Sequence, residues 1–371
     1  MFSAELKKLF FITRVRNWYA RFERPISSFS LISGFFFDAL TLKRVDLFWE
    51  NFWVIVHLLI VAVCIILIDR HENGEIDTKD PAKTHFWFIN VLQFFFGGLL
   101  STYLVFYFRS GSLAVSWPFF LFLAAAFIAN ESFKKHYSRL SFQISLFFFS
   151  LFSFAIFIVP VILHRIGPDV FLISGAVSLV GLLIFLSILR FFAKEKFSKS
   201  RKILRFSIAG IFLAVNAFYF LNLIPPIPLS LKNAGIYHSI VKNADGNYTV
   251  EYEDEGWLSF FSFHDNFHEM PGDTAYAYSA VFSPTLLNAD IVHEWQTYDE
   301  VSRQWITKTV IELPLTGGRE GGYRTYSFKN NLTPGKWRVN VETKRGEVLG
   351  HLRFNVILQT SEPILKTDIK N

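Results

Sequence analysis

The most suggestive spacing of metal-binding residue types in this chain is that of His264 and His268, which are four residues apart. Asp265, Glu269 and Asp273 lie close by in the sequence. A histidine pair at this spacing can bind zinc when both side chains lie on one face of a helix. Here the pair lies between a strand-like run and a Pro-Gly turn, so polar loop residues are the favoured interpretation and a zinc or calcium site is the alternative. We therefore predict no metal and no other cofactor.

The sequence motifs of the common enzyme classes are absent. There is no GxSxG nucleophile elbow, no HExxH helix, no P-loop and no dinucleotide-binding fingerprint. No catalytic residue is predicted, and the pattern favours a non-enzymatic protein while leaving an enzyme open. The formal net charge of +6 does not indicate nucleic-acid binding, because the basic residues gather between apolar runs and form no single stripe.

Three polar residues inside long apolar runs form a second group of candidates: Asp38, His57 and Gln93. An ionisable residue inside a membrane span is a candidate functional group. Asp38 lies near the end of its run and is followed by Lys43 and Arg44, so pairing with these bases or contact with water is the alternative. His57 and Gln93 lie deeper, where they would either line a path or bridge neighbouring helices through hydrogen bonds.

The apolar runs that carry these residues predict a membrane domain over residues 26–224. About 20 apolar residues form a helix that crosses a hydrocarbon core of about 30 Å. The first run is the shortest, and because it starts late and no small-residue cleavage pattern follows it, no signal peptide is expected. The seven runs cover residues 26–42, 51–68, 86–108, 112–130, 140–163, 168–192 and 203–224.

The distribution of basic residues predicts how these spans are oriented. With seven spans, the N-terminal tail and the loops on its side hold 19 Lys and Arg residues, whereas the short loops on the other side hold four. Because basic loops stay in the cytoplasm, this difference predicts a cytoplasmic N-terminus and an extracytoplasmic C-terminal region in the cytoplasmic (inner) membrane. With six spans the difference nearly disappears, so seven is the better count.

The N-terminal tail, residues 1–25, mixes aromatic and aliphatic residues with six basic ones. One interpretation is an amphipathic helix that lies along the cytoplasmic membrane surface, with its charges near anionic head groups. The other is an ordinary basic flank that only fixes the orientation of the first span.

Beyond Pro225 the chain changes to short alternating runs separated by turn residues. This pattern predicts a Pro-rich linker over 225–235, an all-β, immunoglobulin-like sandwich over 236–358 and a flexible tail over 359–371. The single cysteine, Cys64, lies in an apolar run, so no disulfide within one chain can stabilise the sandwich. Strands are expected near 236–241, 247–252, 257–263, 274–282, 289–297, 303–313, 322–328, 335–343 and 347–357.

One of these runs, "GYRTYSFK", is the candidate binding face, formed by Tyr323, Arg324, Thr325 and Ser327. Its two faces hold Tyr323, Thr325 and Ser327 on one side and Arg324, Tyr326 and Phe328 on the other. If the two aromatic side chains of the second face point inward, a row of hydroxyls faces solvent with Arg324 near an edge, which suits a sugar or a peptide. A solvated sheet face without a ligand is the alternative.

The run from "HEWQTYDE" to "YRTYSFKNNLTPGKWRVNVETKRGEVLGHLRF" resembles the bacterial family called domain of unknown function 2914. The family's recurrent pattern is an Arg-Thr-x-Ser-x-Lys strand, then Gly-x-Trp-x-Val, then a Gly turn before a final β run. Residues 33–46 also resemble the opening of the family's multi-span members. The resemblance implies a multi-pass membrane protein, and it implies no catalytic residue because the family has no assigned activity. The matching residues are Arg324, Thr325, Ser327, Lys329, Gly335, Trp337, Val339 and Gly346.

These patterns together predict a helical membrane bundle of about seven spans that presents a β-sandwich outside the cytoplasm. The sandwich is expected to bind an envelope protein or glycan, and the lipid bilayer is the partner of the helices. The alternative is a membrane enzyme or small-solute transporter with its site among the spans. Nucleic acid is not an expected partner.

Overall fold

The structure is a computed structural model of the chain. It describes residues 33–42, 44, 46–76, 80–132, 139–192, 194–253, 265–270, 272–284, 287, 289–315, 319 and 321–370. The predictions for the tail 1–25, for the strand 257–263 and for His264 therefore lie outside the described residues. The chain divides into two compact units: Met1–Val105 with Phe122–Leu151 and Gly181–Ile208, and Phe106–Leu121 with Phe152–Val180 and Ala209–Asn371.

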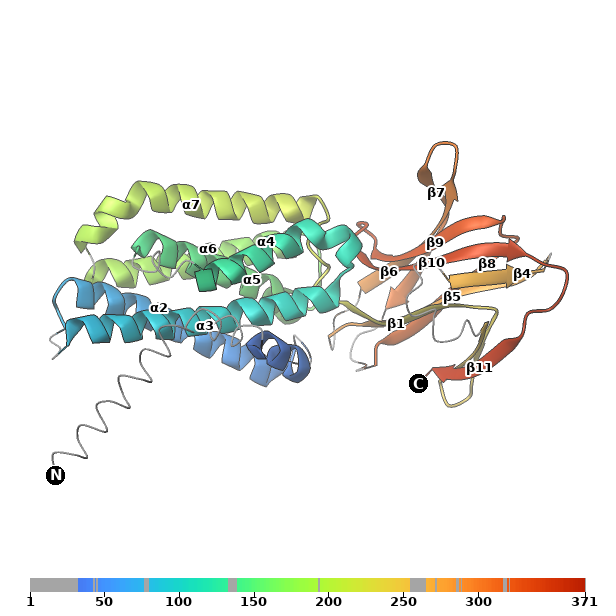
Figure 1. The fold of residues 1–371 in the computed structure, drawn as a ribbon, viewed down its shortest axis with the longest axis horizontal. Helices are drawn as coiled ribbons and strands as arrows, with labels where there is room; N and C mark the ends of the chain where they lie inside the picture. Colours follow the sequence, from blue (N-terminus) through green and yellow to red (C-terminus); the bar gives the residue numbers. More distant parts are fainter. Residues whose placement is uncertain are drawn as a thin grey trace, which may run out of the picture. The chain divides into compact units, whose positions relative to one another are not determined.

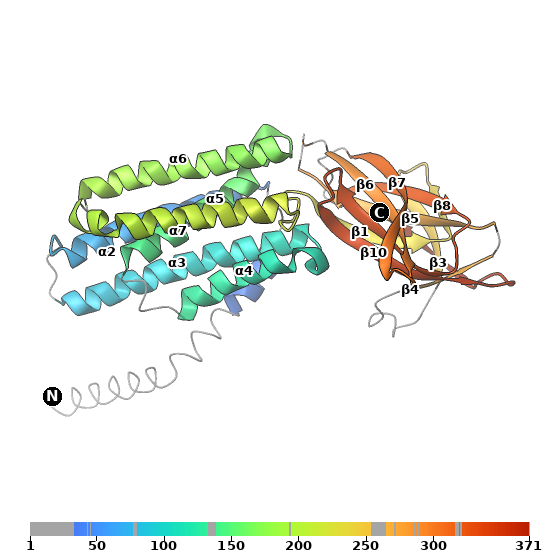
Figure 2. The same cartoon turned by 90° about the horizontal axis from the view of Figure 1, so that it is seen from above.

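The N-terminal part of the chain is helical. Residues 33–41 form a helix, and the helices α2 to α7 are each drawn as one continuous rod in Figures 1 and 2. Five helices are long and apolar enough to cross a membrane, while the apolar part of α4, Leu113–Ile128, is shorter. Several membrane-spanning helices are thus confirmed at the level of length and composition, and the count of seven stays a prediction. The bounds are α2 Phe48–Glu72, α3 Pro81–Ser110, α4 Leu113–Ser132, α5 Leu140–Leu163, α6 Pro168–Phe192 and α7 Lys194–Phe220.

The surface of these helices has the polarity expected of a protein in lipid. Large apolar side chains such as Phe94, Phe191 and Phe206 are exposed. Conversely, Ser174 and Ser178 are buried, and each hydroxyl donates to a carbonyl of its own helix. Polar groups in hydrocarbon must find partners within the protein. Apolar side chains on the outside and hydrogen-bonded polar side chains on the inside therefore fit a bilayer better than water.

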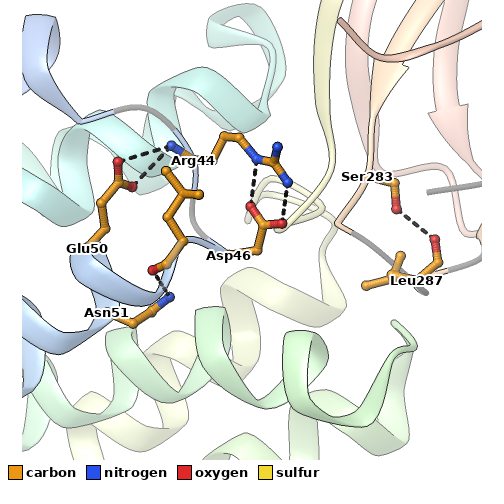
Figure 3. Close-up of polar contacts among 7 residues, drawn as sticks. Arg44, Asp46, Glu50, Asn51, Ser283 and Leu287 are labelled. Atoms are coloured by element: carbon orange, nitrogen blue, oxygen red, sulfur yellow. Dashed lines mark hydrogen bonds and ion pairs between the residues drawn. The ribbon is translucent and has the colours of Figure 1, made fainter. Parts of the chain in front are cut away.

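The turn into α2 is held by charged side chains (Figure 3). The Arg44 guanidinium donates to Asp46, at 3.0 and 2.6 Å, and its backbone N–H donates to the Glu50 carboxylate at 3.1 Å. Asn51 donates to the Leu47 carbonyl at 3.0 Å. An acidic residue in the first turn of a helix also complements the helix dipole, so these contacts define where α2 begins.

The C-terminal part is built of β-strands (Figures 1 and 2). A three-stranded sheet has the order β1-β5-β8, a five-stranded sheet the order β4-β10-β9-β6-β7, and another three-stranded sheet the order β11-β3-β2. The pairs are antiparallel except for β4 with β10, which is parallel. The bounds are β1 Ser230–Tyr237, β2 Ser239–Lys242, β3 Tyr248–Glu253, β4 Asp265–Glu269, β5 Thr274–Phe282, β6 Ala289–Asp299, β7 Gln304–Leu315, β8 Tyr323–Asn330, β9 Gly335–Thr343, β10 Val348–Leu358 and β11 Leu365–Lys370.

An aromatic core joins the five-stranded sheet to the sheet of β1, β5 and β8. Trp295 and Phe354 are fully buried, and their rings meet edge to face at 6.3 Å. Ala275 and Ala277 of β5 pack against the same cluster. Small residues on one sheet opposite large rings on the other let the two inner faces interdigitate. Trp337 belongs to this core, as the alternation in its strand predicts.

A layer of tyrosines covers the other side of the sheet of β1, β5 and β8. Its members come from that sheet and from the sheet of β11, β3 and β2, with Ile240 and Val250 between them. The tyrosines are Tyr237, Tyr248, Tyr252, Tyr276, Tyr278 and Tyr326.

Two predicted boundaries differ from the structure. The tail 359–371, expected to be flexible, contains β11, which pairs with β3 along its whole length. The linker 225–235 is shorter than expected, because β1 already begins at Ser230 and Leu229 belongs to a buried core cluster. In both places the residues are stabilised by neighbours distant in sequence, which local composition does not reveal.

The turn before β8 leads to a test of this packing. Gly322 has φ +88°, and a Cβ there would lie 3.0 Å from backbone carbons of Ala280 and Val281. Gly272 has φ +100° but open space around it. We expect Gly272→Ala to destabilise the β region by about 1 kcal/mol through backbone strain alone. Gly322→Ala should cost more than about 2 kcal/mol, since the neighbouring strand must also move. Pulse proteolysis of the full chain in urea measures both, and equal midpoints would contradict the strand contact.

Candidate functional site

Asp38 lies on the helix 33–41 and is half-buried. Ser101 of α3, through a hydrogen bond, and His57 of α2, through its charge, lie near enough to influence the Asp38 carboxyl group. These three residues form the Asp38 cluster, although the sequence separates Asp38 from His57 by a turn and half a helix.

His57 has a defined orientation in this cluster. Its Nδ1 is 2.8 Å from the Trp53 carbonyl, which can only accept, so Nδ1–H is the donor and Nε2 is left to face α3. A Cβ on Gly98 would lie 3.2 Å from Nε2, tighter than ordinary contact. The missing side chain of Gly98 is thus what lets the imidazole approach α3.

Ser101 supplies a hydroxyl one helical turn beyond Gly98. Its side chain is 3% exposed, and the Asp38 carboxyl group is the partner near its hydroxyl. Buried hydroxyls are normally bonded, which fits this pairing.

The cluster lies deep in its helices. His57 is nine residues after the start of α2 at Phe48, and Ser101 is nine residues before the end of α3 at Ser110. At about 1.5 Å per residue, both lie about 13 Å from those helix ends.

Gln93, the third intramembrane candidate, joins two helices. Its Nε2 donates to the Asn130 carbonyl at 2.9 Å, and Asn130 Nδ2 donates to the Gln93 carbonyl at 3.2 Å. A Cβ on Gly97 would lie 3.3 Å from Asn130 Nδ2, so this glycine also makes room for a polar side chain. The exchange of amide bonds links α3 to α4.

In the β region, the face of β8 that was expected to carry exposed hydroxyls points inward at Ser327. Ser327 is 3% exposed, whereas Phe328, expected inside, is 56% exposed. Ser327 Oγ accepts from Trp295 Nε1 at 2.9 Å and lies 2.9 Å from His293 Nδ1. His293 Nε2 in turn lies 2.8 Å from Ser279 Oγ. Both faces of β8 are thus covered: Ser327 faces the five-stranded sheet, while Tyr326 packs in the tyrosine layer and Phe328 at the end of the strand is exposed.

The hydrogen bonds among Ser279, His293, Trp295 and Ser327 form a buried link between the two sheets, and none of these side chains is charged. Burial lowers the pKa of His293 to about 4, so the imidazole is neutral at pH 7. Because Ser327 Oγ already accepts from Trp295, its own proton can go to His293 Nδ1, and Nε2–H then donates to Ser279. This arrangement pairs the indole N–H, the Ser327 O–H and the imidazole N–H.

The other residues of the predicted binding face are also partly or fully covered. Arg324 is 5% exposed, and its Nη1 donates to Asn247 Oδ1 at 3.0 Å and to the Lys370 carbonyl at 2.6 Å. Tyr323 and Thr325 are half-buried. Arg324 therefore ties β8 to the sheet of β11 and β3, and any role of this face in binding stays a prediction.

His268, proposed from sequence as one half of a zinc pair, lies on strand β4. Its Nδ1 is 2.5 Å from the Glu253 carboxylate, which also accepts from His238 Nε2 at 2.8 Å. Burial opposes ionisation of Glu253, but the hydrogen bonds from His238 and His268 outweigh it and lower the pKa of the carboxyl. No group of three or more potential metal ligands occurs within the described residues.

The outer face of the five-stranded sheet carries a hydrogen-bonded set of polar side chains that sequence reasoning did not select. Asn340 Nδ2 donates to Glu294 at 2.8 Å, and Thr307 donates to the same carboxylate at 2.6 Å. Gln296 donates to Thr307 at 3.0 Å and accepts from Arg338 at 2.5 Å. We call this set the polar platform: Glu294, Gln296, Thr307, Arg338, Asn340, Glu342, His351 and Arg353.

The platform is connected by hydrogen bonds and is nearly neutral at pH 7. His351 Nδ1 donates to Asn340 Oδ1 at 2.8 Å, and burial, Arg353 and Arg338 lower the pKa of His351 to about 4. The Arg338 guanidinium lies 4.4 Å from the Trp305 ring centre. Donors and acceptors held on strands in this way can orient a polar ligand. The sequence signal that could have found the platform is the alternation along β9. It places Arg338 and Asn340 on the face of the strand opposite to that of Trp337.

Comparisons with known proteins bear on this region. Residues 288–356, which hold the whole platform, match the family described as "Protein of unknown function (DUF2914)". The match confirms, for these residues, the family that the sequence resembles. The description of that family assigns no activity. In the comparison with curated proteins, the chain matches none.

Solved structures add no argument about fold or function. A β-glucosidase from Listeria innocua in complex with gluconolactone is 11% identical over 33% of this chain, with a TM-score of 0.18, and the chain spans 16% of its length. An alkylpurine DNA glycosylase, AlkC, from Pseudomonas fluorescens, bound to DNA containing an abasic site analogue, is 9% identical over 85% of this chain and 100% of that one, with a TM-score of 0.21.

The buried link predicts unequal roles for the two hydroxyl residues of β8. Ser327→Ala removes the acceptor of Trp295 Nε1–H and a partner of His293, and should cost about 1–3 kcal/mol. Thr325→Ala, at a half-buried position on the same strand, should change stability by less than about 0.5 kcal/mol. Urea midpoints of the full chain, again by pulse proteolysis, measure the difference. A Thr325→Ala cost as large as that of Ser327→Ala would rule out the special role of this link.

The platform predicts a pH dependence of stability. Burial and the nearby Glu294, against the opposing Arg338, raise the pKa of Glu342 from 4.5 to about 7. Between these values the folded state binds the proton and the unfolded state does not, so stability should fall as the pH rises from about 4.5 to about 7. Because the carboxyl is half-buried, we expect about 1–2 kcal/mol. The difference between the wild-type protein and Glu342→Gln over this range isolates the effect, and parallel pH profiles would contradict it.

Proposed function

We propose that this is a seven-span protein of the cytoplasmic membrane whose β region lies outside the cytoplasm and binds an envelope glycan or protein. The polar platform is the observation that carries the proposal. The immunoglobulin-like class of the sandwich and the cytoplasmic N-terminus belong to the same proposal, supported by the strand pattern and by the 19 basic residues on one side of the seven runs.

The platform has the chemistry of a recognition surface for a polar ligand of low charge. Arg338 and Arg353 are balanced by Glu294 and by the partly ionised Glu342. Neutral amide and imidazole groups lie between these charges. A polyhydroxylated or peptide ligand can use both donors and acceptors here, whereas a strongly anionic or cationic ligand would find no excess of opposite charge.

A second candidate is a transport or enzymatic function within the helices. The feature that favours it is the Asp38 cluster among the apolar helices, since ionisable groups in a bilayer are costly and are retained for function or for pairing. Under this function the β region would only support the helices.

Binding can be tested with the full chain in detergent, offered purified envelope glycan and, separately, envelope proteins. The double variant Glu342→Gln with Arg353→Ala changes the platform without removing the hydrogen bonds of Asn340 and Gln296. We expect it to lower retention at least about tenfold, equivalent to about 1.4 kcal/mol. A chain stopped after Ser230 should retain nothing.

The matched control is Asp368→Asn with Lys370→Ala on β11, which makes the same change of charge in another sheet. It should bind like the wild-type protein. Equal losses for the two double variants would exclude the platform, and equal retention by the shortened chain would move the function to the helices.

A further inference from the structure

We propose that a cavity of the β region, separate from the polar platform, binds a small organic cation through its ammonium group. The volume of the cavity is about 350 Å³, within the range of sites that hold small molecules. Its lining comes from β1, β3, β4, β10 and β11 and, among the described residues, includes none of the platform. Binding in this cavity can therefore be measured independently of binding at the platform.

Aromatic rings form part of the cavity wall. The rings of Tyr237 on β1 and Tyr252 on β3 have centres 6.5 Å apart and planes at 87° to each other. The His238 imidazole stacks on Phe267 of β4, with ring centres 4.1 Å apart and planes 9° apart. Gly235 leaves room for the Tyr237 hydroxyl, since a Cβ there would lie 2.5 Å from its oxygen. Ring faces nearly at right angles can enclose a compact apolar or cationic group.

Acidic side chains outnumber basic ones in the described lining of the cavity. Glu253, Asp265 and Asp368 contribute three carboxylates, whereas Lys370 contributes one ammonium group. The hydrogen bonds from His238 and His268 hold the Glu253 carboxylate in place. The electrostatic field of this lining therefore attracts a cationic ligand and repels an anionic one.

The chain already places one ammonium group of its own in this environment. Lys370 Nζ on β11 lies 5.8 Å from the centre of the Tyr237 ring and 2.7 Å from Asp368 Oδ2. A ring face and a carboxylate thus stabilise this cation together. Tyr252 and Asp265 supply the same two groups elsewhere in the lining, where they can receive the ammonium group of a ligand.

Lys336 and Tyr298 show the same type of contact on a more exposed surface. Lys336 Nζ lies 5.2 Å from the centre of the Tyr298 ring and 2.9 Å from Glu300 Oε1. The Lys336 side chain is 48% exposed, whereas that of Lys370 is 22% exposed. An ammonium group in the cavity thus contacts less water, which strengthens its attraction to an aromatic ring.

Isothermal titration calorimetry of the full chain in a non-ionic detergent tests the cavity. The probes are choline and, separately, ethanolamine, and the control is the neutral alcohol in which a carbon atom replaces the choline nitrogen. We expect at least one of the two cations to bind at least about tenfold more tightly than this alcohol, because only a cation gains from the carboxylates and the ring faces. If neither cation binds more tightly than the alcohol, the proposal is wrong.

Three variants locate the binding within the cavity. Tyr252→Leu removes a ring and Asp265→Asn removes a charge, and each should weaken binding of the cation at least about threefold. If Tyr252→Leu does not fold, Asp265→Asn decides, because Asp265 is exposed and its change should leave the fold intact. Lys370→Ala removes the ammonium group of the chain itself and should strengthen binding at least about threefold, because that group no longer competes for the Tyr237 ring.

The matched controls are Tyr298→Leu and Glu300→Gln, which remove a ring and a charge beside Lys336 and outside the cavity. Both should bind the cation like the wild-type protein. The platform variant Glu342→Gln with Arg353→Ala should do so as well, which separates a failure of the cavity from a failure of the platform. Equal weakening by the control variants and by the cavity variants would overturn the site.

Discussion

The β region depends on the packing of Trp295 between two sheets. The indole fills the space opposite Ala275 and Ala277, while its N–H reaches across to Ser327. Apolar contact and a hydrogen bond therefore fix the same side chain from two directions. Without disulfides, a small sheet pair needs such a residue, because apolar packing alone tolerates sliding whereas a buried donor requires one partner at one register.

A related constraint acts in the helices, where water is not available as a partner. Gly97 and Gly98 are adjacent on α3, and each admits a polar side chain from a different helix. One of these approaches ends in a closed exchange of amide bonds, and the other brings the His57 imidazole against the backbone of α3. Glycine at both positions thus allows polar side chains of two other helices to pack closely on α3.

Much of the fold was predictable from the sequence, and the failures have physical causes. Alternation gave β2, β3 and β5 to β10, since period two is a property of the backbone. It missed β4, where polar loop residues were expected, and most of β1, which was assigned to the linker. It could not show that both faces of β8 are covered, because Ser327 becomes an interior residue only when His293 and Trp295 are present. Strand β11 was missed because its side chains are mostly exposed and its stability comes from pairing with β3. The meeting of Asp38 with His57 likewise requires the tertiary arrangement.

The parallel pair of β4 and β10 has a consequence for how the protein is made. In its sheet β4 adjoins β10 alone, so residues 265–269 cannot acquire a strand neighbour there until residues 354–358 have been synthesised. In the hairpins β6–β7 and β9–β10 the second strand follows the first within a few residues, so each pair can form as soon as it has been synthesised. Assembly of this sheet can therefore begin at the β6–β7 hairpin, at the edge opposite β4, and the β4 edge closes last.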